Sequence, residues 1–272
     1  MTIPNFLSNA YAPFRYYTER VGVVGEIITR LRSELTALGW TEPVANTFQC
    51  PSDGAGHWMR CYFYQYSGAV LQMSLSDQNG TTICIRTLSV TSGGAVFYYT
   101  GKFHCFIEAL NNDATGVYSY LAAFLLDTTP DPPASSPSHV IGNGATNSVG
   151  GYDGQGLFER WFALDNAAAQ VANRLRGPVT FGGSTYAMTM ASGRGIFDEC
   201  LIYQLIGGSG AANYVWTGRF CQALIGPTVP NIVGAEYQIP IDDGTVATFK
   251  ATSHFYLSGV YPYPCRLWMR KS

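Results

Sequence analysis

Charged residues are scarce in this sequence. Of its 272 residues, 16 are lysine or arginine and 18 are aspartate or glutamate, so 12% carry a charge, against about 25% in ordinary soluble domains. The net charge of −2 excludes the basic surface with which nucleic-acid-binding proteins neutralise phosphates. Few charges and 18 tyrosines are typical of a surface that other protein covers. An alternative explanation for this composition is a drift of the source genome towards arginine, since only three of the basic residues are lysine.

Long apolar runs are also missing. The longest ones, residues 117–126 and 200–206, are well below the roughly 20 residues that a membrane-spanning helix needs. The N-terminus has no basic segment followed by an apolar one, so we expect no secretory signal. We therefore expect no membrane span and a protein that folds in a cytoplasm.

Cysteine and histidine form no recognisable disulfide or metal pattern. The seven cysteines are scattered and include no Cys-x-x-Cys, so we interpret them as reduced, buried side chains. The four histidines are isolated from one another. The one cluster of potential ligands, Asp53, His57 and Cys61, combines a loop residue with strand residues, a common arrangement without any metal. We therefore predict no metal site and no cofactor.

Motifs for catalysis are missing as well. Residues 207–211 lack the final glycine of a nucleophile elbow. The neighbouring carboxylates Asp198 and Glu199 would point apart on a strand, as would Asp242 and Asp243. A glycosidase instead needs two carboxyl groups that face each other across the substrate. We predict that the protein is not an enzyme and has no catalytic residue.

The clearest element in the sequence is an amphipathic helix. Apolar residues make up 47% of the chain, enough to exclude disorder of the whole. From about Glu19 they recur at every third or fourth position, the period of one helix face, and Gly39 ends the helix. The predicted stripe consists of Val24, Ile28, Leu31, Leu35 and Leu38.

Alternation of apolar and polar residues predicts antiparallel strands after Pro43. Asn79-Gly80 between two alternating runs is a strong hairpin signal, because both residues tolerate positive φ. Residues 117–126 fit a strand or a short helix equally well. The other strands are expected at 57–66, 69–76, 81–90, 95–99, 103–107, 179–181, 186–190, 199–206, 214–225, 236–241, 245–251 and 255–260.

Residues 127–156 differ from the rest of the chain. They hold four prolines, six glycines and no lysine or arginine, and they exceed the usual connection of about 4–6 residues. A second helix is expected at 157–175, where apolar residues again recur at helical spacing. We predict an α+β fold of two helix-plus-antiparallel-sheet halves, 18–126 and 157–272. The long loop 127–156 joins them, as a domain boundary or an extended loop, and an extended arm, 1–17, precedes them.

Several segments resemble structural proteins of tailed bacteriophages, in particular neck, tail and baseplate components. They are the arm rich in Pro, Asn and aromatics, the helix end Leu38-Gly39-Trp40, the turn Thr100-Gly101-Lys102-Phe103, the loop 127–156, and the stretch 225–241 ahead of Asp243-Gly244-Thr245. The resemblance implies a non-enzymatic virion protein, assembled in the cytoplasm of the bacterial host. Its partners would be copies of itself in a symmetric assembly and other virion proteins.

Two other functions are compatible with the sequence. A glycan-binding module would use aromatic side chains as stacking platforms, and its candidates are Trp58, Trp216 and Tyr263. An enzyme that degrades envelope polysaccharide would use acids drawn from Glu108, Glu199 and Glu236. The basic C-terminal segment 266–271 could contact an acidic partner, but a solvated tail is the default for three charges.

Overall fold

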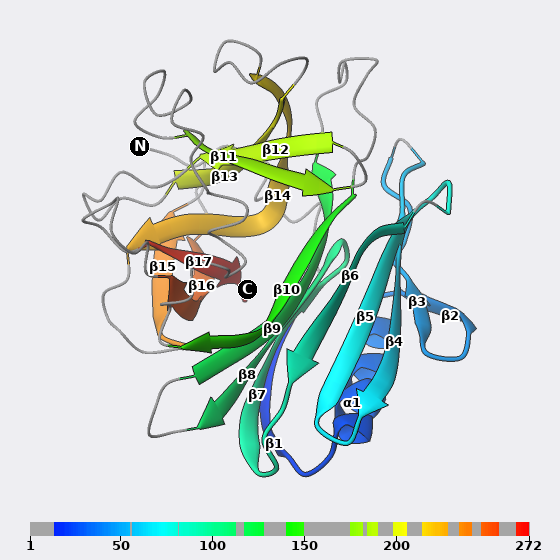
Figure 1. The fold of residues 1–272 in the computed structure, drawn as a ribbon. Coiled ribbons are helices and arrows are strands. Elements are labelled where there is room, and N and C mark those ends of the chain that lie inside the picture. The colour runs from blue at the N-terminus through cyan, green and yellow to red at the C-terminus, as the bar shows by residue number, and fades with distance from the viewer. Residues whose placement is uncertain are drawn as a thin grey trace.

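The fold is mostly antiparallel β-sheet with one helix, as the computed structural model shows for the part of the chain that it describes (Figure 1). The antiparallel strands predicted from the sequence are confirmed where the structure describes them. The strand predicted at 255–260 lies outside the described residues except for Phe255. The described residues are 14–54, 56–80, 82–112, 117–127, 140–149, 175–181, 184–189, 198–205, 214–227, 234–240, 246–255 and 265–271.

Strands precede and follow the helix along these residues. In chain order the elements are β1 (Phe14–Val21), α1 (Val24–Ala37), β2 (Thr41–Val44), β3 (Thr47–Gln49), β4 (Met59–Ser67), β5 (Val70–Asp77), β6 (Thr82–Ser89), β7 (Gly94–Gly101), β8 (His104–Asn112), β9 (Val117–Asp127), β10 (Val140–Val149), β11 (Leu175–Phe181), β12 (Ser184–Thr189), β13 (Asp198–Leu205), β14 (Tyr214–Pro227), β15 (Glu236–Pro240), β16 (Val246–Phe255) and β17 (Cys265–Arg270).

The strands form three antiparallel sheets. The first contains β1 and β7 to β10, the second contains β2 to β6 in chain order, and the third contains β11 to β17. The first and third join into one twelve-stranded sheet through β9 and β14, which share two residue pairs, Asp127 with Arg219 and Leu126 with Phe220. Strands from before and after the predicted loop 127–156 thus belong to one sheet.

Helix α1 lies between the first and second sheets (Figure 1) and belongs to the core that they share. All residues of the predicted apolar stripe are buried, as expected. Gly39 ends the helix with φ +85°. Its N–H donates to the Thr36 carbonyl, and the next N–H, from Trp40, donates to the Leu35 carbonyl, each over 3.0 Å. This pair of bonds satisfies the last carbonyls of the helix, as the sequence predicted for this glycine.

The helix begins later than predicted. Residues 14–21 form β1, which pairs with β7 along its whole length, and α1 starts only at Val24. Tyr16 and Tyr17 pack on opposite faces of this strand, against Tyr99 and Tyr98, so β1 shows no alternation of apolar and polar residues. The predicted arm is therefore wrong for 14–17, and residues 1–13 lie outside the described part of the chain.

Two predictions for the middle of the chain are resolved by strand pairing. Residues 117–126, for which the sequence predicted either a strand or a short helix, lie in β9 between β8 and β10. Residues 119–125 are all buried. A strand buried on both faces needs no alternation. The predicted loop 127–156 contains β10, at Val140–Val149, which pairs with β9. The second predicted helix lies outside the described residues, except for Leu175, the first residue of β11.

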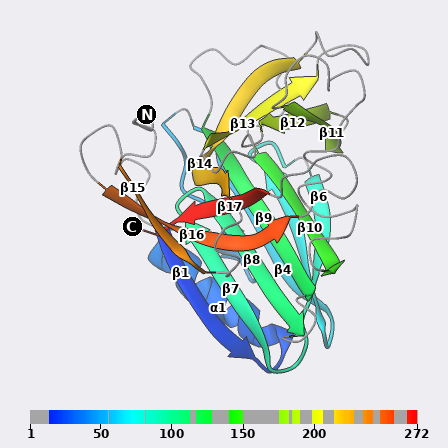
Figure 2. The ribbon, with the colours of Figure 1, turned by 90° about the vertical axis from the view of Figure 1, so that its left-hand side faces the viewer.

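The second face of the first sheet packs against the strands β16 and β17, which cross it in Figure 2. The Tyr99 hydroxyl donates to the Ala251 carbonyl over 3.0 Å, and the Lys250 ammonium lies 4.1 Å from the centre of the Tyr16 ring. The basic C-terminal segment is part of this layer as β17, with Arg270 buried. The expected solvated tail is therefore wrong, because these residues pair with β14 and β16.

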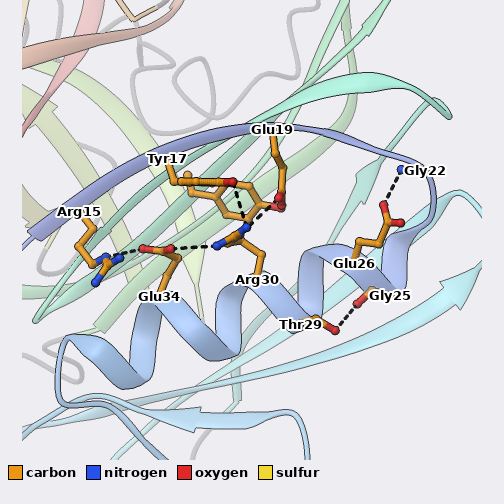
Figure 3. Close-up of polar contacts among 10 residues, drawn as sticks. Arg15, Tyr17, Glu19, Gly22, Gly25, Glu26, Thr29, Arg30 and Glu34 are labelled. Carbon is orange, nitrogen blue, oxygen red and sulfur yellow. Dashed lines mark hydrogen bonds and ion pairs between the residues drawn. The ribbon is translucent and has the colours of Figure 1, made fainter.

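A network of charges holds β1 to α1 (Figure 3). The Glu34 side chain is buried, and its two carboxylate oxygens lie 2.6 Å from Nε of Arg15 and 3.6 Å from Nη1 of Arg30. Arg30 also reaches Glu19 on β1 (3.3 Å), and Glu19 accepts a 2.6 Å hydrogen bond from the Tyr98 hydroxyl. A buried carboxylate needs such partners. The network therefore fixes the position of β1 along the helix.

Gly101 and His104 account for the turn between β7 and β8. The His104 ring lies so close to Gly101 that a Cβ at this glycine would fall 2.2 Å from the ring carbon Cε1. The Phe124 ring is stacked on the His104 ring, with the ring centres 5.7 Å apart. The histidine is fully enclosed, and burial lowers the pKa of its side chain from 6.5 to about 3.

We expect His104 to make the protein less stable in acid. The unfolded chain binds a proton at this histidine below pH 6.5, whereas the folded chain resists it down to about pH 3. Within that window, stability falls as the pH falls, by about 1.4 kcal/mol per pH unit. His104→Phe keeps an aromatic ring at this position but has no group that binds a proton. The free energy of unfolding of this variant, measured with urea, should therefore depend less on pH than that of the wild type. An equal pH dependence in both proteins would contradict this.

Candidate functional site

The candidate site is the outward surface of the second sheet, here called the outer face. On β4, the buried residues Met59, Cys61 and Phe63 alternate with the more exposed Arg60, Tyr62 and Tyr64. Strand register extends this surface across the sheet, because Tyr62 lies opposite Thr47 on β3 and Ser74 on β5, which lies opposite Ile85 on β6. The outer face consists of Thr47, Gln49, Arg60, Tyr62, Tyr64, Val70, Gln72, Ser74, Ser76, Ile85 and Thr87.

The composition of the outer face is unusual for a sheet surface in water. All of its residues are exposed or half-buried, yet Arg60 is the only charged one among them. Protein surfaces that stay in contact with water commonly carry charges of both signs, which oppose association. Here tyrosine, serine, threonine and glutamine occupy these positions, the types that supply contact area and adaptable hydrogen bonds in protein recognition.

The one charge on the outer face is held in place. Nε of Arg60 donates to Oε1 of Gln49 over 2.9 Å, and the guanidinium lies 4.5 Å from the centre of the Trp58 ring. Trp58 is itself half-buried against the core. Arg60 therefore covers the tryptophan from one side while the core covers it from the other. An arginine ordered in this way loses less side-chain entropy on binding than a mobile one.

Aromatic and aliphatic side chains supply most of the exposed apolar area near this surface. The rings of Tyr62 and Tyr64 stack with their centres 5.3 Å apart, and Tyr62 is 41% exposed. Ile85 is 51% exposed on β6, and Tyr66, next to the outer face in the β4–β5 hairpin, is 67% exposed. Stacking orders both tyrosines before any partner arrives.

The potential metal ligands are only partly brought together. His57 and Asp53 form a close pair in the loop before β4, with Nδ1 2.8 Å from Oδ2 and the His57 N–H donating to Oδ1 over 2.8 Å. Cys61 points into the core from β4. Among the described residues, no three histidine, cysteine or acidic side chains are arranged to hold a metal ion. Cys50, Cys61 and Cys105 are buried.

The three carboxylates considered for an enzyme lie in different surroundings. Glu108 on β8 is fully buried. Glu236 on β15 accepts hydrogen bonds from Lys250 and Lys271, 2.7 and 2.9 Å away, which lower the pKa of its carboxyl group to about 2. Glu199 lies on β13, where only the backbone is described. A general acid must reach the substrate and keep its proton near neutral pH, and neither Glu108 nor Glu236 meets both needs.

The three aromatic candidates for glycan binding are also separated. Trp58 borders the outer face and is covered by Arg60. Trp216 lies on β14 opposite Tyr203, and its side chain is outside the described part, as is the whole of Tyr263. The outer face itself was missed at the sequence level. Its signal was the residues at alternate positions of 60–64 and 70–76, all uncharged except Arg60, on the side of each strand that faces away from the core.

Within the described part of the chain, the one helix is too short and too polar to cross a membrane. No protein-family model and no curated protein matches this chain.

Proposed function

We propose that this protein is a structural subunit of a tailed-phage particle, in the tail, baseplate or neck, and that it acts by binding other protein. The observation that carries the proposal is the outer face, a broad sheet surface with a single, already ordered charge. Protein interfaces are depleted of charge at their centres and enriched in tyrosine and arginine. The scarcity of charge along the whole chain, 12%, points the same way.

The proposed mechanism is assembly without chemistry. Copies of the chain and other virion proteins bury the outer face, and the ordered Tyr62, Tyr64 and Arg60 provide anchor side chains at low entropic cost. Assembly takes place in the cytoplasm of the bacterial host, and the protein ends up in the virion. No catalytic step, metal or cofactor is part of the proposal.

Glycan binding has less support as a function for the same surface. A sugar ring stacks on an open aromatic face, but Trp58 lies between the core and Arg60. The stacked pair Tyr62 and Tyr64 also uses ring surface within the protein. Specific retention on a glycan array that is lost in Tyr62→Ser, with folding intact, would favour glycan binding over assembly.

Incorporation into particles tests the proposal. The tagged wild-type protein is expressed in cells that produce the particles encoded by the same genome as this chain. It should copurify with those particles. Ser74→Glu places a charge at the middle of the outer face and should reduce incorporation by about tenfold or more, because a buried unpaired charge weakens association strongly. Incorporation is measured by mass spectrometry of purified particles.

The matched control makes the same change elsewhere. Ser33 is exposed on α1, away from the outer face, and Ser33→Glu should be incorporated like the wild type. Circular dichroism and urea unfolding verify that both variants fold. Absence of wild-type protein from the particles, or equal incorporation of the two variants, would contradict the proposal.

A further inference from the structure

We infer that the outer face docks against the outer face of a second copy of this chain, related by a two-fold axis. The inference rests on the proposed function, because it names the partner that covers this surface. Three properties of the surface support it: its charge, its area and the arrangement of its residues.

The charge of the outer face selects an uncharged partner surface. A partner rich in lysine or glutamate would lose the hydration of those charges and gain no opposite charge in return, because the only charge on the outer face, Arg60, already has partners in Gln49 and Trp58. A second outer face satisfies this condition without any further assumption. In a two-fold contact each copy contributes the same surface.

The area of the outer face fits a weak dimer. The four strands β3 to β6 span about 19 Å at about 4.8 Å per strand, and the eight residues of β5 extend about 26 Å. The product is on the order of 500 Å² per copy, or about 1,000 Å² in total, at the lower limit for a specific interface. We therefore expect a dissociation constant on the order of 100 µM, which repeated contacts in a particle would strengthen.

The arrangement of residues places uncharged side chains at the axis. Tyr62, Ser74 and Ile85 form one row across neighbouring strands, and Arg60 lies two residues further along β4. With the axis through this row, two copies of Arg60 on opposite sides would be separated by about 13 Å, given about 3.3 Å per residue. That exceeds the Debye length of about 8 Å at physiological ionic strength, so their repulsion is screened.

Sedimentation equilibrium of the full chain tests the inference. Between about 1 and about 500 µM, the average mass of the wild type should rise from 29.6 kDa towards twice that value. Ser74→Glu should raise the dissociation constant at least about tenfold, because two carboxylates would meet near the axis, and Ser33→Glu should leave it unchanged. A constant monomer mass, or equal weakening by both variants, would overturn the inference.

A second pair of variants covers the case in which Ser74→Glu fails to fold. Tyr62→Ser shortens an exposed side chain without adding charge and should also weaken the dimer. Under mild oxidation, Ser74→Cys should form a disulfide-linked dimer beyond the wild-type level, because its sulfur would lie near the axis, whereas Ser33→Cys should not. Equal cross-linking of the two cysteine variants would also overturn the inference.

Sedimentation and particle incorporation together separate this inference from the proposed function. If the wild type stays monomeric while Ser74→Glu is lost from particles, the outer face binds a different virion protein, so self-docking is wrong and assembly stands. If the wild type dimerises through this surface but never enters particles, self-docking stands and the proposed function is wrong. If the wild type dimerises and enters particles, and Ser74→Glu weakens both dimerisation and incorporation, the results support both self-docking and the proposed function.

Discussion

Phe106→Ala should lower the free energy of unfolding by about 3–5 kcal/mol, the usual cost of emptying a buried aromatic site. Phe106 is completely buried on β8. Its ring lies 5.6 Å from that of Tyr99 and is stacked on that of Tyr120 at 6.3 Å. These rings line the face of the first sheet that meets β16, where the Tyr99 hydroxyl binds the Ala251 carbonyl. The substitution therefore opens a cavity where two layers meet.

Urea unfolding measures this effect, and two variants serve as controls. Phe106→Leu keeps most of the volume and should cost less than about 1.5 kcal/mol. Tyr66→Ala removes an aromatic ring that is 67% exposed and should change stability by less than about 0.5 kcal/mol. If Phe106→Ala cost no more than Tyr66→Ala, the burial of Phe106 in the core would be wrong.

Glu34→Ala should lower the free energy of unfolding by about 3 kcal/mol. It removes the buried carboxylate that lies between Arg15 and Arg30 (Figure 3). Removing one partner of a buried ion pair costs about 3–5 kcal/mol. The lower end applies here, because Arg15 is half-exposed and Arg30 less so, and both can turn partly towards water. The substitution should also weaken the attachment of β1 to the helix.

The measurement combines urea unfolding with hydrogen exchange. Amides of β1 should exchange faster in Glu34→Ala than in the wild type, since β1 lies at the edge of its sheet among the described strands and pairs there with β7. Glu34→Gln keeps the shape and hydrogen-bonding oxygen and should lose less stability. Thr36→Ala, at an exposed position on the same helix, should be nearly neutral. Unchanged exchange in β1 would show that the network does not hold this strand.

Local patterns predicted those elements whose two sides face different surroundings. Helix α1 has one apolar stripe and a glycine end, and β4 and β5 alternate between core and outer face. Elements buried on both sides gave no such pattern. Hence β9 stayed open between strand and helix. Strand β1 carries tyrosines on both faces and so shows no alternation, and it was taken for an arm. Strand β10 was taken for loop, since pairing uses backbone groups that every residue except proline provides.

The candidate site required both kinds of information. Alternation placed Tyr62 and Ser74 on the outward side of their strands, which is a local property. Only strand register showed that these residues, Thr47 and Ile85 form one continuous surface. Register depends on which residues of neighbouring strands pair with each other, and the alternation within a single strand does not specify that.

The amino-acid sequence by itself determined the low charge, the helix and the alternating strands, because these depend on residue type and on neighbours within one or two turns. The tertiary structure decided where the remaining charges lie. Glu34 and Glu236 are taken up by arginine or lysine partners, and Glu108 and His104 are buried. The outer face of the second sheet holds a single charge because strand pairing, which only folding establishes, places Arg60 beside uncharged residues of β3, β5 and β6.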